Sequence, residues 1–410
     1  MHQDSPYRFF LLLPEKTENR NRIPAVKAAV QSERRKAMKK TLTTIIAFFT
    51  LAFIIQPGIS AGAAQEEKIQ LAILLDTSNS MDGLINQAKT QLWKIVNELA
   101  RARKNGKSPR LEVALYEYGK DSIPSGEGHL RMVTPLTTDL DRVSEQLFSL
   151  TTNGGSEYCG MVIDRAAKGL LWSRSSNVYR VIFIAGNEPF TQGNVDYRVS
   201  VKNAIKRGIV VNTIFCGNFQ DGVNTMWKHG AELADGTYTT IDHNSKAVHI
   251  RAPQDSEIVR LGRELNRTYI AYGQTGMARK LRQKAQDKNA AEMSESAIIE
   301  RSVAKASKQY RNSGWDLVDA VRNNSVDLKS IDDEDMPENM RKMTPAQRKA
   351  HIKKMSEKRA SIQKKIARLN RERREYVEKK RKKLAGESTI DTAIIKTIRS
   401  QAAKKSYTFE

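Results

Sequence analysis

Cysteine, histidine and the aromatic residues are scarce in this chain of 410 residues. The two cysteines form no CxxC pair and the six histidines are scattered, which excludes a Cys/His zinc ribbon. His243 and His249 share one stretch, where we expect surface or core histidines rather than ligands. No GxxxxGK[ST], HExxH or GxSxG occurs, so the sequence offers no P-loop, zinc-protease or serine-hydrolase site. We therefore predict that the protein is not an enzyme.

Positive charge is present in excess but is concentrated near the two ends of the chain. The formal net charge is +23, of which residues 341–383 carry +15 and residues 1–64 carry +6. The middle of the chain is nearly neutral, so the basic character belongs to local segments. Tyr376 is the only aromatic residue in 341–383, which argues against the stacking of nucleic-acid bases on this segment.

The N-terminal segment has the layout of an export signal. Residues 38–63 begin with two lysines, continue through an apolar stretch and end in the small residues Ala61-Gly62-Ala63. This pattern predicts a signal peptide and export to the periplasm or cell envelope, which argues against a nucleic-acid ligand. An uncleaved membrane anchor is the alternative, and it also exports the residues on its C-terminal side. Residues 1–37 are expected to be an unstructured or mis-assigned extension.

Apolar strand patterns alternate with helical patterns over residues 68–273. The run IQLAILL (69–75) is typical of a strand buried on both faces. Strands separated by helices predict a doubly wound, mostly parallel sheet of six strands flanked by helices. Pro135 demotes 130–137 to an edge strand. The expected strands are 69–75, 111–118, 130–137, 180–186, 209–217 and 237–242.

The remaining third of the chain is predicted to be all-helical. We expect a helical connector at 279–331, an acidic linker at 332–343, and a long basic helix with a C-terminal amphipathic helix at 344–410. Thr344 and Gln347 form a capping box at the start of the long helix. A heptad seam comes next, but Arg359 and Arg373 occupy two of its positions.

The long basic helix (344–383) admits three interpretations. It is a solvated arm packed on its neighbours, a rod that binds another protein or self-associates as a coiled coil, or an electrostatic binder of anionic membrane or acidic glycan. The sequence alone does not choose among them.

The stretch LLDTSNSM (74–81) brings oxygen ligands to the end of the first strand. Ligands of open α/β sheets bind beyond the carboxyl ends of the parallel strands. A strand-to-helix turn at this place lets Asp76, Ser78 and Ser80 converge on one point. One carboxylate, two hydroxyls and water suit a hard cation such as Mg²⁺.

This D-x-S-x-S pattern after an apolar first strand resembles the von Willebrand factor type A domain. In that family the pattern is the first part of a metal-ion-dependent adhesion site that takes Mg²⁺, Mn²⁺ or Ca²⁺. The resemblance implies a second-loop hydroxyl from Ser156, with Glu157 beside it as an additional ligand. The third loop departs from the family, since Gly186 and Asn187 stand where an aspartate is expected. Glu188, two residues on, is expected to ligate the cation instead, directly or through water, with Asn187 as an additional candidate ligand.

The resemblance implies a protein-binding module rather than a catalyst. In the family, a carboxylate of the partner protein completes the coordination of the cation. The loops GGSEYCG and GNEPF are also similar to those of exported bacterial members with basic helical tails. The alternative is a structural, envelope-associating protein, in which the domain is a metal-free scaffold and the basic helices bind anionic surface components.

Both cysteines are expected at the same edge of the predicted sheet. Cys159 comes after the second loop and Cys216 ends a strand. A disulfide between them would stabilise the fold by roughly 4 kcal/mol in the chain-entropy model. Two buried, unpaired thiols are the alternative.

Overall fold

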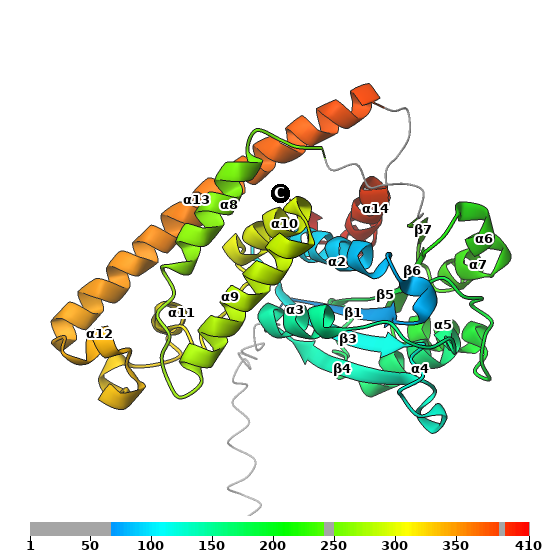
Figure 1. Ribbon diagram of the computed structural model, residues 1–410, viewed down its shortest axis with the longest axis horizontal. Helices are drawn as coiled ribbons and strands as arrows, with labels where there is room; N and C mark the ends of the chain where they lie inside the picture. Colours follow the sequence, from blue (N-terminus) through cyan, green and yellow to red (C-terminus); the bar gives the residue numbers. More distant parts are fainter. Residues whose placement is uncertain (1–66, 242–249, 385–389, 410) are drawn as a thin grey trace, which may run out of the picture. The chain divides into compact units, whose positions relative to one another are not determined.

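The computed structural model describes residues 67–241, 250–384 and 390–409. They contain a six-stranded sheet (Figure 1). Its strands are β1 (Lys68–Asp76), β3 (Arg110–Tyr118), β4 (Leu130–Thr137), β5 (Tyr179–Gly186), β6 (Ile209–Phe215) and β7 (Tyr238–Thr240). They are ordered β4-β3-β1-β5-β6-β7, and only β4 is antiparallel to its neighbour. The predicted mostly parallel six-stranded sheet is confirmed, with the Pro135 strand at its edge.

The register of the central strands brings their carboxyl ends to one edge. Asp76 pairs with Tyr118 on β3, and Leu75 pairs with Ala185 on β5. The apolar run of β1 is buried along its length because neighbouring strands flank it and helices cover both faces. Loops that leave β1, β3 and β5 therefore meet at this edge.

Helices cover the two faces of the sheet with separate cores. One face carries α4 (Cys159–Gly169), α5 (Tyr197–Lys206) and α7 (Trp227–Glu232). The other face carries α2 (Ile85–Ala100), α3 (Leu140–Ser149) and α14 (Ile390–Ala403). Further helices pack outside this layer: α10 (Glu295–Ala306) contacts α2, α8 (Asp255–Asn266) and α13 (Pro345–Leu384) contact α10, and α9 (Gly276–Met293) contacts α3 and α10. Short elements complete the chain: η1 (Asn79–Met81), β2 (Ala102–Arg103), η2 (Ser125–Glu127), α6 (Phe219–Asn224), α11 (Leu317–Arg322), η3 (Leu328–Ser330), η4 (Asp333–Asp335), α12 (Glu338–Arg341) and β8 (Thr408–Phe409).

The C-terminal helix α14 returns to the sheet and packs beside α2 and β7. Gln401 of α14 accepts hydrogen bonds from Tyr179 Oη (2.7 Å) and Asn212 Nδ2 (3.1 Å), both on sheet strands. Beyond it, Tyr407 donates to the carbonyl of Lys68 (2.7 Å), and β8 pairs with β2. The segment from α14 to β8 therefore packs against strands that come much earlier in the chain.

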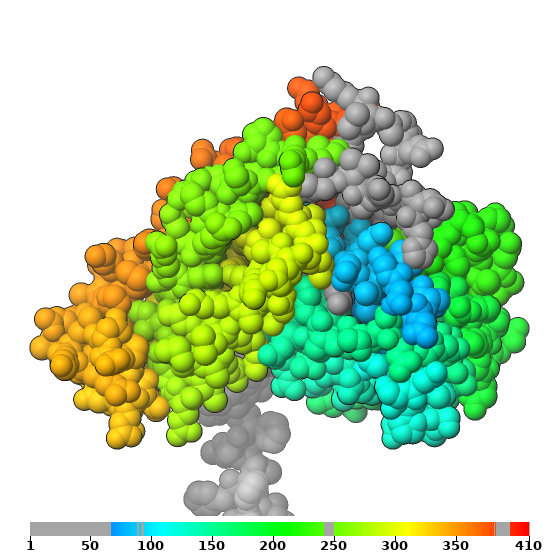
Figure 2. Space-filling model, viewed as in Figure 1, coloured from blue at the N-terminus to red at the C-terminus, as the bar shows by residue number. Residues whose placement is uncertain are grey.

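The long helix α13 is bound along its heptad seam by helices of the same chain. Ile352, Ile362 and Ile366 of the seam are buried, and α13 contacts α8, α10 and α11. Figure 2 shows the orange α13 lying against the yellow-green segment that contains these helices. Self-association would therefore have to use a different face of α13. The predicted capping box is confirmed, because Thr344 N–H donates to Gln347 Oε1 (2.8 Å) and Gln347 N–H to Thr344 Oγ1 (3.3 Å).

Both arginines of the seam are buried and paired with carboxylates. Arg359 binds Asp316 and Asp319, and Arg373 binds Asp255. Such pairing is what makes a buried arginine tolerable within an otherwise apolar seam.

The segment predicted as an acidic linker contributes to a small core of its own. Met336, which follows η4, and Met340, within α12, are buried against Leu317 and Val318 of α11 and Ile352 of α13. Among the residues placed by the structure, no helix has the length and apolarity needed to cross a membrane. The predicted signal peptide (38–63) and the extension before it lie outside the described residues.

Candidate functional site

The candidate site is built around Asp76, the last residue of β1. Asp76 is fully buried, and its Oδ1 accepts the backbone N–H of Ser78 at 2.8 Å. This turn points both serine hydroxyls the same way, since Ser78 Oγ and Ser80 Oγ are 2.8 Å apart. The D-x-S-x-S residues are therefore brought together as the sequence predicts.

Three loops are joined at this edge by hydrogen bonds. Asn79 N–H donates to the carbonyl of Gly154 (3.1 Å), and Asn153 N–H donates to the carbonyl of Thr77 (2.8 Å), which ties the first loop to the second. Ser80 Oγ donates to Asn187 Oδ1 (3.0 Å), which ties the first loop to the third. The loops after β1 and β5 thus share one polar cluster with the loop that leads into α4.

Glu157 places a second carboxylate in the cluster. It is 1% exposed, whereas its neighbour Ser156 is partly exposed. A Cβ added at Gly119 would lie 2.8 Å from both Asp76 Oδ1 and Glu157 Cγ, so the two acidic side chains are neighbours. Gly119 also has φ of +79°, so glycine is required there for conformation as well as for space.

Two carboxylate oxygens in this cluster have no hydrogen-bond partner among the described residues. They are Asp76 Oδ2 and Glu157 Oε2, and both are buried. Neither side chain forms an ion pair with a described lysine, arginine or histidine. A buried carboxylate oxygen without a donor is costly, so a cation or a proton is expected to satisfy each one.

Burial and mutual repulsion shape the electrostatics of the pair. Burial raises the pKa of Asp76 to about 7, although the hydrogen bonds from Ser78 oppose this shift. Burial also raises the pKa of Glu157, and the nearby carboxylate of Glu188 adds to the rise. A divalent cation would neutralise Asp76 and Glu157 together, and would return both pKa values toward their ordinary range.

Tyr118 fills the space beside Gly186, the position at which the sequence resemblance leads us to expect an aspartate. A Cβ at position 186 would lie 2.4 Å from Tyr118 Oη and 2.9 Å from Asp76 Oδ2. The Tyr118 hydroxyl is held in place because it donates to the carbonyl of Ala185 (2.9 Å). The buried tyrosine therefore fills the space that an aspartate side chain would enter.

The structure distributes the sequence-predicted residues unevenly. Asp76, Ser78, Ser80 and Asn187 are linked by hydrogen bonds, and Glu157 lies beside them. Glu188 is partly buried at the rim, where its carbonyl accepts a hydrogen bond from Trp227 Nε1 (2.7 Å). In the described ranges, no group of three or more His, Cys, Asp or Glu side chains is placed to hold a metal. Any cation here would therefore depend on two carboxylates supplemented by hydroxyl, amide and water oxygens.

Tyr118 and Gly119 shape the site but were not singled out by the sequence patterns. Gln192 was missed as well, although its Oε1 accepts the Glu157 backbone N–H at 3.0 Å. The only signal available was a tyrosine and a glycine at the end of a predicted strand. Such a pair is common enough that it identifies no particular site.

The predicted Cys159–Cys216 disulfide is wrong. Both cysteines are buried free thiols. Cys159 packs in the core beneath α4 and α5, whereas Cys216 packs in the core on the opposite face of the sheet. Cys159 Sγ lies 3.8 Å from Tyr118 Oη, and burial raises the pKa of both thiols. Their position at one edge of the sheet did not reveal that the two side chains leave it on different faces.

Comparison with known proteins places this site in a recognised domain. Residues 70–244 match the family described as von Willebrand factor type A domain. No curated protein matches the chain.

Solved structures with a similar fold come from bacteria and from a mussel. The conserved hypothetical protein BatB from Bacteroides thetaiotaomicron is 17% identical over 42% of this chain and 90% of its own, with a TM-score of 0.33. An aerotolerance-related membrane protein from Bacteroides fragilis NCTC 9343 is 18% identical over 43% and 92%, with a TM-score of 0.29. Proximal thread matrix protein 1 from the mussel byssus, solved with a zinc occupied MIDAS motif, is 14% identical over 44% and 43%, with a TM-score of 0.32.

Proposed function

We propose that the von Willebrand factor type A domain formed by residues 70–244 is a non-enzymatic protein-binding module that works through a divalent cation. The observation that carries the proposal is the pair of buried, unpartnered carboxylate oxygens on Asp76 and Glu157. Domains of this family are generally binding modules, so a cation site at the strand ends would serve recognition rather than catalysis.

The donor set favours a hard cation. Asp76 and Glu157 supply two carboxylates, Ser78 and Ser80 supply hydroxyls, and Asn187 supplies an amide oxygen at the rim. Oxygen donors of this kind suit Mg²⁺, Mn²⁺ or Ca²⁺ and offer nothing to a soft metal. In this proposal Glu157 supplies the second negative charge that Gly186 cannot, and Ser156 is not a ligand.

The partner would be a protein that presents a carboxylate. Asp76 and Glu157 balance the charge of a divalent cation, and in this proposal a coordination position that is left to water takes a carboxylate oxygen of the partner. Ser80 is exposed at the mouth of the site, and Asn187 and Glu188 are partly exposed there. The Glu188 carboxylate is close enough to Glu157 to raise its pKa. It is therefore the side chain of this protein that would compete with a partner carboxylate for the open position.

Titration calorimetry of the full chain with Mg²⁺, Mn²⁺ and Ca²⁺ after chelator treatment tests the cation site. We expect one saturable site in the parent protein and no saturation in Asp76→Asn or Glu157→Gln. Ser156→Ala should retain binding. Asp121→Asn, which neutralises an exposed carboxylate at the same edge, is the matched control and should bind normally. A folded parent protein without saturable heat would overturn the proposal and favour the metal-free scaffold.

Water-proton relaxation with bound Mn²⁺ tests the open position. Exchangeable water on the ion should give a strong relaxation enhancement, and acetate should reduce it by displacing that water, whereas acetamide should not. An enhancement that acetate leaves unchanged would contradict recognition through a carboxylate. Absence of an enhancement would mean that the cation is closed by protein ligands, with Glu188 as the first residue to suspect. Glu188→Gln would then be expected to restore the response to acetate.

We also propose that the chain is exported to the periplasm or cell envelope. The supporting observation is the order of charged, apolar and small residues in 38–63. N-terminal sequencing of the protein recovered from an expressing bacterium tests this, with a mature start at Ala64 expected. Recovery of an intact Met38 or Met1 start in the soluble cytosolic fraction would contradict export.

A further inference from the structure

The outer face of α13 is a long basic surface that the site above does not use. Ten lysines and arginines of α13 lie between Pro345 and Arg371, against one acidic residue, Glu357. Arg359 is buried in the seam and Arg348 is partly buried in an ion pair with Asp333. Most of the others are exposed, so the charge faces solvent rather than the fold.

Several of these cations have no ion-pair partner in the part of the chain that the structure describes. They are exposed as well, and comprise Lys349, Lys354, Lys358, Lys364 and Arg371. Lys353 and Arg368 have only long i,i+4 contacts, at 3.9 Å to Glu357 and 3.8 Å to Glu372. Exposed pairs of this type contribute little, so these side chains also remain available to an external anion.

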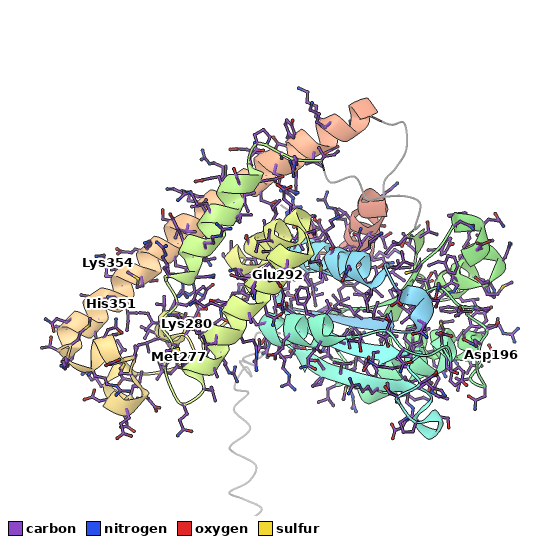
Figure 3. The ribbon with its side chains drawn as sticks, in the orientation of Figure 1. Asp196, Met277, Lys280, Glu292, His351 and Lys354 are labelled. Atoms are coloured by element: carbon purple, nitrogen blue, oxygen red, sulfur yellow. The ribbon has the colours of Figure 1, made fainter. Side chains whose placement is uncertain are left out.

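The helix presents its charges as a rigid, nearly linear array. Its seam is packed on α8, α10 and α11, which fixes the rotation of the helix about its axis and therefore the direction in which its exposed side points. Lys349, Lys364 and Arg371 fall on this opposite side at the helical period of 3.6 residues. Figure 3 shows Lys354 and His351 on the outer edge of α13. At 1.5 Å per residue, the array from Lys349 to Arg371 covers roughly 33 Å of the 40-residue helix.

We propose that this outer face of α13 adsorbs to the surface of an anionic lipid bilayer. A straight row of unpaired cations complements a plane of phosphate headgroups, in which every cation meets an anion without bending either partner. Small residues, Ala350, Ala360, Ser361 and Ala367, lie between the charged ones and permit close approach. The described part of α13 has no exposed large apolar side chain, so the contact is electrostatic and peripheral rather than inserted.

A nucleic-acid partner fits the same charges less well. The exposed face lacks aromatic side chains on which bases could stack, because Tyr376 is half-buried and lies on the seam. The phosphate backbone of a duplex winds around its axis, so a straight helix of this length would contact it over only a short stretch. Duplex RNA is therefore the alternative that the test must exclude.

Vesicle co-sedimentation of the full chain, performed in chelator, tests the proposal independently of the cation site. The vesicles contain phosphatidylglycerol and phosphatidylcholine in a one-to-two ratio, and phosphatidylcholine alone is the neutral arm. We expect binding only to the anionic vesicles and progressive loss as salt shortens the screening length. The failure of this test would leave the calorimetric result at Asp76 untouched.

Two triple variants separate this face from bulk charge. Lys349→Ala/Lys364→Ala/Arg371→Ala removes three charges from the outer face at positions where alanine favours the helix. It should weaken vesicle binding about 100-fold, since each cation near a surface contributes about 5-fold. The control, Lys202→Ala/Lys206→Ala/Arg207→Ala, removes three exposed charges in and just after α5 and should bind as the parent does.

Three outcomes would overturn the proposal. The first is absence of binding to anionic vesicles at low salt. The second is an equal loss in both triple variants, which would assign the effect to net charge. The third is binding of duplex RNA through the outer face, lost in the α13 variant, without any binding to vesicles.

Discussion

Arg359 is the most informative single residue to remove, because it holds two carboxylates in the interior. It is 1% exposed, and its Nη1 donates to Asp316 Oδ2 (2.6 Å) and Asp319 Oδ1 (2.8 Å). Its other donors reach the hydroxyl of Thr268 (3.0 Å) and the carbonyl of the same residue (2.6 Å). The guanidinium also lies 4.1 Å from the ring centre of Tyr269.

Arg359→Met should lower the free energy of unfolding by about 3–5 kcal/mol, since it leaves Asp316 buried without a counter-charge. Asp319 keeps only the half-exposed Arg322 at 2.8 Å. Burial raises the pKa of Asp316 even though Arg359 lowers it, so loss of the arginine would destabilise the charged form of Asp316 further. Urea unfolding followed by circular dichroism and by tryptophan fluorescence measures the loss. Lys358→Met, the exposed neighbour, is the matched control and should stay within about 0.5 kcal/mol of the parent.

Neutralising the carboxylates should recover part of the loss. Combining Arg359→Met with Asp316→Asn and Asp319→Asn keeps the helix cap that Asp316 gives to α11 but removes both buried charges. A loss of unfolding free energy below about 1 kcal/mol in Arg359→Met, or no recovery in the combined variant, would refute the argument that pairing of buried charges holds α13 in place.

Three further perturbations address the site and the closure of the domain. Gly186→Asp should lower the free energy of unfolding by about 1–3 kcal/mol, because its Cβ would lie 2.4 Å from Tyr118 Oη. The same substitution in a Tyr118→Phe background should cost less. Equal costs in both backgrounds would refute the steric argument. In chelator, stability should fall by up to about 4 kcal/mol as pH rises from 4 to 7, because the folded state holds the Asp76 proton to a pKa of about 7 and the unfolded state releases it near 4. Saturating Mg²⁺ or Asp76→Asn should flatten this slope, and a flat profile in untreated apoprotein would contradict the shift. Ile398→Ala, at a fully buried position of α14, should cost about 2–5 kcal/mol in the same assay, and parent-like stability would show that α14 contributes no core.

Much of the fold was predictable because it rests on local patterns. Apolar runs identified the buried strands, Pro135 identified the edge strand, and the Thr344 capping box marked the start of α13. The convergence of Asp76, Ser78 and Ser80 was also predictable, because strand-to-helix turns place such residues at one point. The presence of a cation there remains a prediction.

The remaining features depend on contacts between distant parts of the chain. The burial of Glu157 depends on how the loop before α4 folds against the end of β1, and no periodicity records it. The free thiols of Cys159 and Cys216 result from which face of the sheet each side chain enters. Arg359 looked like a defect in a heptad seam, because its partners Asp316 and Asp319 lie some forty residues away.

The return of α14 to the sheet has a consequence for synthesis of the protein. Ile394, Ile398 and Ala402 cover apolar sheet surface that β1, β5 and β6 have already formed, and they leave the ribosome after almost everything else. Until they arrive, the nascent chain holds a nearly finished sheet with part of one face uncovered, which is the condition that recruits chaperones and invites aggregation. A chain interrupted before Ile394 would keep its cation-site loops and lack its cover. Copies interrupted before Ile394 are therefore expected to be recognised by proteases through their exposed sheet.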